Sequence, residues 1–230
     1  MKIINCGWLV NATFGSWPID GQPPDDLPLS MRRRLSSLGR QTLQVLNTCT
    51  KGLNSKLIPW VVSCRHGDIG RRLNLLSNLV QEEMLSPTDF SMSVHNAIIG
   101  VFSIATGNKH THSALAAGPN SFEAGLLESV ALLKEKGGSV GYIYYDYIVT
   151  DELSDRINDD GQVECFAMVL SNDTEGTVLV EYSIVKNAMA SNDVAVNSFS
   201  INKLLCFFKN NEKKFTVPVG GGEILFARTF

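Results

Sequence analysis

Residues 85–133, LSPTDFSMSVHNAIIGVFSIATGNKHTHSALAAGPNSFEAGLLESVALL, decide the fold that we expect for this chain. Two apolar stretches with helical spacing flank a short strand of small residues, expected at Thr111–Ala117. The strand passes through a tight turn, Ala-Ala-Gly-Pro-Asn-Ser, into a helix expected at Ser121–Leu133. Many α/β enzymes present a nucleophile on such a strand–turn–helix unit. This turn contains no cysteine, which excludes a thiol nucleophile at the position.

The composition is that of an ordinary globular domain, with 44% hydrophobic and 19% charged residues in a chain of 230. The formal net charge of −3 argues against nucleic acid as the main partner, and the run Arg32–Arg34 is interpreted as a solvated helix face. No apolar run approaches the ~20 residues that span a bilayer. Five scattered cysteines without a CxxC pair predict neither a metal site nor a disulfide framework, which fits a cytoplasmic location.

Strands and helices alternate along the predicted chain. The first part is expected to hold a strand at 2–10, a loop at 20–28, a helix from Ser30, a strand at 57–63, a helix at 70–84 and a central, buried helix beginning at Thr88 and reaching Ile104. The later part is expected to hold a strand at 139–149, a hairpin of strands at 163–170 and 177–184, a helix near 199–208 and a strand at 223–228. This order favours one α/β domain over residues 1–230, with a mixed, mostly parallel sheet covered by helices.

Three motifs carry a resemblance to a known family. They are SCRHGD at 63–68, LSPTDFSMSVHN at 85–96, and AAG at 116–118 followed by Phe122 and GLLE at 125–128. Together they resemble the N-terminal half of β-ketoacyl synthases, which have the thiolase-like fold, so the resemblance implies a single thiolase-like lobe without the second catalytic half. The SPTDFSxSVHN run is similar to a short subfamily that accompanies full-length ketosynthases in bacterial aryl polyene clusters and acts like chain length factors.

Two departures from the family pattern argue against catalysis. The position of the family's nucleophilic cysteine aligns with Ala117, beside Gly118, and neither side chain can form a thioester. The family's two catalytic histidines belong to its second half, whereas all four histidines here lie within residues 66–112. The resemblance therefore implies a noncatalytic subunit without a cofactor, paired with a full-length ketosynthase whose substrates arrive on an acyl carrier protein.

The resemblance also implies where this subunit would meet its partner and the acyl chain. The helices between Gly70 and Thr106 would close one end of an acyl tunnel at the interface, and the sheets would join through the strands at Thr111–Ala117. The residues expected at the tunnel or interface are Met92, His95, Asn96, Ile99, Phe102, Ala114, Ala116, Ala117 and Phe122. Ile99 or Phe102 is expected to help close the tunnel. Core packing of these apolar residues and a structural hydrogen bond of His95 are the alternatives.

Two other functions stay open at this point. A stand-alone hydrolase or acyltransferase would use Ser121 or a cysteine, but no histidine follows Ser121 to act as its base, and capping of the helix by Asn120 or Ser121 explains the residues. A homodimer that binds an acyl or polyene chain is the second. His110 and His112 have the i, i+2 spacing of metal ligands on a strand, but no third ligand is evident.

Overall fold

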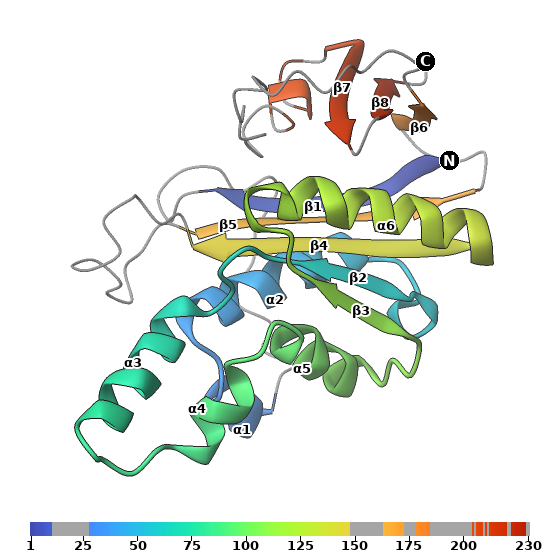
Figure 1. Cartoon of the computed structure of the whole chain (residues 1–230). Coiled ribbons are helices and arrows are strands. Elements are labelled where there is room, and N and C mark those ends of the chain that lie inside the picture. The colour runs from blue at the N-terminus through green and yellow to red at the C-terminus, as the bar shows by residue number, and fades with distance from the viewer. Residues whose placement is uncertain are drawn as a thin grey trace, which may run out of the picture.

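A computed structural model shows the chain as one sheet with helices against its faces (Figure 1). It describes residues 1–10, 28–147, 163–172, 178–184, 212–219 and 222–228, together with residues 204, 206–208 and 210. Nearly all of the predicted loop at 20–28 and most of the predicted helix at 199–208 lie outside these residues.

The described elements follow the predicted alternation closely. The strands are β1 (Lys2–Val10), β2 (Trp60–Ser63), β3 (His112–Leu115), β4 (Ser139–Tyr147), β5 (Val163–Ser171), β6 (Val178–Ile184), β7 (Lys214–Val219) and β8 (Gly222–Arg228). The helices are α1 (Leu29–Arg32), α2 (Ser37–Thr50), α3 (Ile69–Val80), α4 (Pro87–Met92), α5 (Ala97–Thr106) and α6 (Ser121–Lys136), with 3₁₀ turns at Ser55–Leu57 and Gly118–Asn120. The sequence analysis did not predict β7.

The strands form one mixed sheet in the order β3-β2-β4-β5-β1-β6-β8-β7. The α/β class and the mixed sheet are confirmed, but parallel pairing is limited to β2 with β3 and with β4. The other five pairings are antiparallel, because no described helix separates most of the later strands and a parallel pair needs a long crossover. The prediction of a mostly parallel sheet is therefore wrong.

The predicted hairpin of β5 and β6 is wrong. The first strand, β1, lies between them and pairs with β5 along its length and with β6 at Lys2 and Ile3. The pattern of apolar residues identified both strands correctly, but it carries no information on which distant strand would separate them.

Alternation along the strands divides the core between the two faces of the sheet. Val61 and Tyr142 face α6, whereas their neighbours Trp60 and Ile143 face α2 and α5. Helix α6 lies so close to the sheet that a Cβ at Gly125 would stand 2.5 Å from the Ser63 hydroxyl oxygen and 2.6 Å from the Tyr142 ring. Glycine at position 125 therefore allows α6 to pack this close to the sheet.

The helix predicted from Ser30 consists of two pieces. Helix α1 ends at Arg32, and Ser36 caps α2 by accepting the N–H of Gly39 at 3.1 Å. Ser36, six residues after Ser30, thus provides the cap, because a capping side chain must stand where the backbone enters the helix.

The long buried helix predicted from Thr88 to Ile104 is also two helices, α4 and α5. Ser86, rather than Thr88, caps α4 by accepting the N–H of Asp89 at 3.2 Å. The Ser93 hydroxyl donates to the carbonyl oxygen of Phe90 at 2.8 Å, where α4 ends. Buried residues of this segment occur only in α5, and α3 and α4 contain none. In Figure 1, α3 and α4 project away from the sheet as an arm (residues 69–94).

Candidate functional site

The turn between β3 and α6 has the shape of a nucleophile-presenting elbow. Strand β3 ends at Leu115, and Ala116, Ala117 and Gly118 are exposed. Gly118 has a φ of +57°, in the region that favours glycine, and a Cβ there would meet open space. The strand–turn–helix unit predicted from the sequence is confirmed. Neither alanine nor glycine carries an atom that could attack a thioester, so the elbow presents backbone alone.

The Ser121 side chain forms its hydrogen bonds within the turn. Its hydroxyl accepts the N–H of Ala117 at 2.9 Å and donates to the carbonyl oxygen of Gly118 at 2.7 Å, and the residue is buried. The hydroxyl proton is thus held in the hydrogen bond to Gly118. The predicted capping of the helix by Asn120 or Ser121 is wrong, because no side chain caps α6 and the Ser121 hydroxyl bonds backbone groups of the turn before it.

A polar cluster of Cys64, His95, Tyr145 and Asp146 lies at the carboxyl ends of β2 and β4. The Cys64 Sγ lies 2.6 Å from the His95 Nδ1, and the Tyr145 hydroxyl donates to the His95 carbonyl oxygen at 2.6 Å. His95 therefore has the structural contacts that we had weighed against a tunnel role. The sequence analysis included Cys64 only in the SCRHGD motif and did not predict Tyr145 or Asp146.

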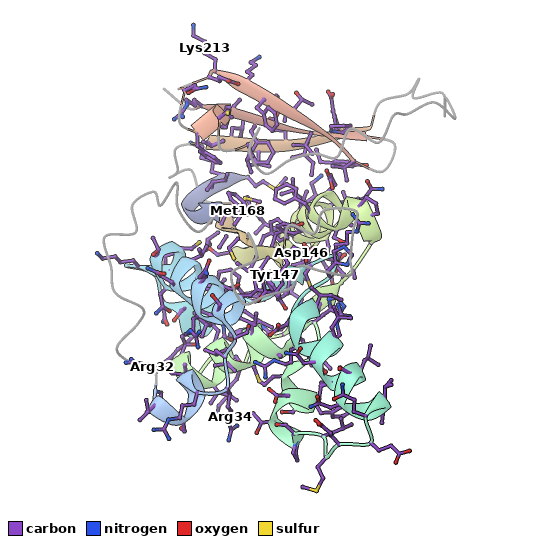
Figure 2. The ribbon with its side chains drawn as sticks, turned by 90° about the vertical axis from the view of Figure 1, so that its left-hand side faces the viewer. Arg32, Arg34, Asp146, Tyr147, Met168 and Lys213 are labelled. Carbon is purple, nitrogen blue, oxygen red and sulfur yellow. The ribbon has the colours of Figure 1, made fainter. Side chains whose placement is uncertain are left out.

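The Asp146 carboxylate holds the loop that follows β2. It accepts the backbone N–H of Arg65 at 2.7 Å and of His66 at 3.0 Å, and that of Tyr147 at 3.0 Å. Figure 2 places Asp146 and Tyr147 in the interior of the molecule. Burial raises the pKa of Asp146 to about 6, although the backbone donors act in the opposite direction. Asp146 thus ties the end of β4 to the segment from which the arm begins.

The same surroundings make Cys64 a poor nucleophile. Burial, followed by the nearby Asp146 carboxylate, raises the pKa of the Cys64 thiol to about 12. Burial, followed by the positive charge of Arg72, lowers the pKa of His95. A protonated thiol beside a neutral imidazole does not form the ion pair of cysteine hydrolases. The cluster therefore positions the loop that follows β2 and holds the Cys64 thiol protonated.

The predicted tunnel and interface residues fall into three environments. Asn96, Ala114, Ala116 and Ala117 are exposed, Met92 and His95 are half-buried, and Ile99, Phe102 and Phe122 are buried. Phe102 packs edge-on against Trp60 with ring centroids 5.7 Å apart, on the face of α5. Phe122 packs edge-on against Tyr142 at 5.7 Å, on the face of α6. The structure thus brings Ile99 and Phe102 together and places Phe122 on the other side of the sheet.

Large apolar side chains are exposed on the arm and on α5, although the sequence predicted a buried helix from Thr88 to Ile104. We call this set the apolar surface: Leu76, Leu79, Val80, Met84, Leu85, Phe90, Val94 and Ile104. Val80 is 82% exposed and Met84 is 95% exposed. Helix α3 packs against α4, and α4 against α5. Large exposed apolar side chains on neighbouring helices are characteristic of a protein–protein contact.

Arg71 fixes the base of the arm. Its guanidinium donates to the Asp68 carboxylate at 3.1 Å and to the carbonyl oxygen of Arg34 at 3.0 Å, and it pairs with Asp89 on α4. One side chain thus joins α3, α4 and the segment after α1. The arm is held in place although many of its large apolar side chains are exposed.

The described residues offer neither a metal-binding cluster nor a membrane-spanning helix. They contain no group of three or more His, Cys, Asp or Glu side chains that could hold a metal ion. Within the same residues, every helix is too short or too polar to cross a membrane.

Comparison with known proteins agrees with the shape of the elbow. The sequence profile described as "Beta-ketoacyl synthase, N-terminal domain" matches residues 8–218. The chain belongs to this family. No curated protein sequence matches the chain significantly.

Solved structures share the fold of this ketosynthase-family chain at low identity. A chain from the ketosynthase ApeO in complex with its chain length factor ApeC from Xenorhabdus doucetiae matches with a TM-score of 0.70 and 20% identity, over 99% of this chain and 100% of that one. The ishigamide ketosynthase/chain length factor matches at 0.55 and 12%, over 80% and 67%. The AntDE:AntF complex of a type II acyl-carrier protein with its ketosynthase matches at 0.56 and 9%, over 81% and 70%. These matches confirm the thiolase-like fold.

Proposed function

We propose that this chain is a noncatalytic, chain-length-factor-like subunit that pairs in the cytoplasm with a full-length β-ketoacyl-acyl carrier protein synthase. The pair would elongate acyl chains of the aryl polyene, polyketide or fatty acid type. The observation that carries the proposal is the apolar surface on α3, α4 and α5. Leaving it in water is unfavourable by about 25 cal/mol per Å² of apolar area, so a partner gains by covering it.

The exposed edge of β3 supports the same assembly. β3 is the last strand at its end of the sheet, and its outer backbone groups pair with no described strand. Ala114 and Ala116 are exposed there, and their small side chains permit the close approach of another backbone. We propose that the partner's sheet joins this one through residues 111–117.

The elbow supports a division of labour between the two subunits. Ala117 and Gly118 stand where the family carries its nucleophile, and Ser121 is engaged within the turn. The ketosynthase partner would supply the cysteine and both histidines, and an acyl carrier protein would deliver the substrate. The match over 99% of this chain and 100% of one chain of the ApeO–ApeC complex favours this arrangement, since that complex pairs a ketosynthase with its chain length factor.

The tunnel residues belong to the same proposal. Met92, His95 and Asn96 lie at the junction of α4 and α5, beside the apolar surface, where a tunnel that ends at the interface would pass. Ile99 and Phe102 lie one and two turns further along α5, buried beneath them. We propose that these five residues, with Phe122 and the alanines at 114, 116 and 117, shape the closed end of the tunnel or its interface, with Ile99 or Phe102 setting its length.

Co-expression with a full-length ketosynthase from the same genome tests the proposal. Size exclusion with mass detection should show a one-to-one heterodimer. The double variant Leu79→Ser/Phe90→Ser should weaken the heterodimer at least a hundredfold, because each exposed side chain contributes about 1.5–3 kcal/mol when buried. Leu57→Ser is the matched control, since Leu57 is 62% exposed but lies in the 3₁₀ turn before β2.

Activity separates this function from the alternatives. Elongation by the heterodimer should survive Ala117→Ser and Ser121→Ala. A lone monomer or homodimer that turns over an acyl thioester, and loses that activity with Ser121→Ala, would establish the hydrolase or acyltransferase function instead. Equal heterodimer affinity in the Leu79→Ser/Phe90→Ser variant and in the Leu57→Ser control would refute the interface on the arm.

A further inference from the structure

Arg72 in α3 is a cation without an acidic partner in the described part of the chain. Its Nε atom is buried and forms no hydrogen bond there, and its guanidinium donates to the carbonyl oxygen of His66. The ion pairs of the described residues join Arg71 to Asp68 and to Asp89, and neither includes Arg72. A guanidinium has five N–H donors, and leaving one of them buried without an acceptor is unfavourable.

The described groups around this guanidinium do not neutralise it. Burial, followed by the positive charge of Arg72, lowers the pKa of His95. Burial also lowers the pKa of His66, and the positive charges of Arg65 and Arg72 lower it further. The Asp146 carboxylate of the same region bonds to backbone N–H groups and forms no ion pair with Arg72. Arg72 thus lies beside two neutral imidazoles and lacks a described carboxylate.

The position of Arg72 on its helix places it beside the apolar surface. Residues 72, 76, 79 and 80 share one side of α3, because spacings of four, seven and eight residues follow the helical turn. Leu76, Leu79 and Val80 are the exposed apolar residues of this helix. Arg72 stands one turn before Leu76, at the base of the arm. A partner that covers these three side chains therefore also reaches Arg72.

We propose that Arg72 binds a carboxylate side chain of the ketosynthase partner and is a charged anchor of the heterodimer. This inference rests on the proposed function. A carboxylate accepts two parallel N–H bonds from a guanidinium, and such a pair is stronger where the protein excludes water from it. Arginine is enriched among the few residues that dominate an interface, where apolar neighbours keep water away.

The apolar side chains beside Arg72 favour a protein carboxylate over a small free anion. A phosphate or acetate ion would pair with the guanidinium but leave Leu76, Leu79 and Val80 in water. A partner surface covers the three side chains and supplies the anion at the same time. The cation also adds selectivity, because a surface without an acceptor at this position would leave it buried and unpaired.

The affinity of the heterodimer tests the pairing. The full-length ketosynthase from the same genome is fluorescently labelled, and its Kd for this chain is measured by sedimentation of a dilution series. Arg72→Gln should raise the Kd at least about thirtyfold, because it leaves the partner's carboxylate buried and unpaired. Arg65→Gln is the matched control. It removes the same charge from an exposed side chain near His66 and should change the Kd less than about fivefold.

Chemical cross-linking distinguishes the pairing from a structural role of Arg72. Arg72→Lys places an amine at the same position, and a carbodiimide joins such an amine to a carboxylate in contact with it. The heterodimer is treated at concentrations above its Kd, and peptide mass mapping should show position 72 linked to an Asp or Glu of the ketosynthase. A residue with a structural role alone would give no such link. Links from position 72 only to this chain, or none, would overturn the pairing.

Three other outcomes would overturn the inference, each in a different way. A heterodimer whose Kd responds equally to Arg72→Gln and to Arg65→Gln would remove the anchor and leave the proposed function standing. Binding of inorganic phosphate to the lone chain, measured by isothermal titration and abolished by Arg72→Gln, would assign the cation to a free anion. The absence of a heterodimer with the unaltered chain would refute the proposed function and this inference together.

Discussion

Replacing Asp146 tests whether burial or hydrogen bonding dominates at the base of the arm. The carboxylate is 3% exposed and accepts the N–H groups of Arg65, His66 and Tyr147. Its pKa is raised from 3.8 to about 6, so the folded protein holds the proton more tightly than the unfolded chain. The two-unit shift corresponds to about 3 kcal/mol. This stability is fully present below pH 3.8 and is lost as the pH rises through 6.

The measurement compares the unaltered protein with Asp146→Asn, which cannot titrate. Urea unfolding, followed by the fluorescence of the chain's tryptophans, including the fully buried Trp60, gives the free energy of unfolding of each protein at pH 7.5 and pH 5.0. From these pKa values, acidification should stabilise the unaltered protein by about 1.4 kcal/mol relative to the variant. The constant offset from the lost acceptor cancels in this difference.

The absence of this change would refute the reasoning. A difference in unfolding free energy that stays constant between pH 7.5 and pH 5.0 would show that the pKa of Asp146 is not raised in the folded protein. The backbone donors would then offset or outweigh burial.

Three further predictions concern the elbow and its surroundings. Gly125→Ala should lower the free energy of unfolding by roughly 1–3 kcal/mol in urea titrations, because the new Cβ overlaps side chains of β2 and β4; stability equal to that of the unaltered protein would contradict the close packing. Ser121→Ala should cost about 1–3 kcal/mol in the same assay, because the turn loses two hydrogen bonds of about 0.5–1.5 kcal/mol each, and no cost would show that these bonds do not stabilise the turn. Iodoacetamide at pH 8 should alkylate the exposed Cys206 in native protein and leave Cys64 unmodified, as read by peptide mass mapping, and rapid modification of Cys64 would contradict its burial and raised pKa.

The features that local sequence predicts well are those decided within one segment. β1, the β3–α6 unit and the elbow without a nucleophile follow from apolar spacing, turn residues and the identity of Ala117 and Gly118. The position of the candidate site was thus readable from a single strand, turn and helix.

Features that depend on distant segments were not predicted. Asp146 meets backbone groups about eighty positions earlier in the chain, and nothing in the strongly apolar run of β4 indicates such partners. The separation of β5 from β6 by β1 is of the same kind.

The prediction of burial for residues of the arm and of α5 is wrong for another reason. Phe90, Val94 and Ile104 have the spacing of a buried helix, and apolar spacing reports that a face needs cover without saying which molecule supplies it. The expectation of burial is wrong for this chain alone, and the proposed heterodimer would restore it.

The central place of β1 has a consequence for how the protein is made. Its partners on β5 follow it by 154 to 169 positions, from Val10 with Glu164 to Lys2 with Ser171. At synthesis rates of about 5–20 residues per second, β5 is synthesised roughly 10–30 s after β1. During that interval the backbone groups of β1 are an unpaired edge, open to wrong pairing with other chains. Slower translation would lengthen this exposure, and a chaperone that binds extended apolar segments would shorten it.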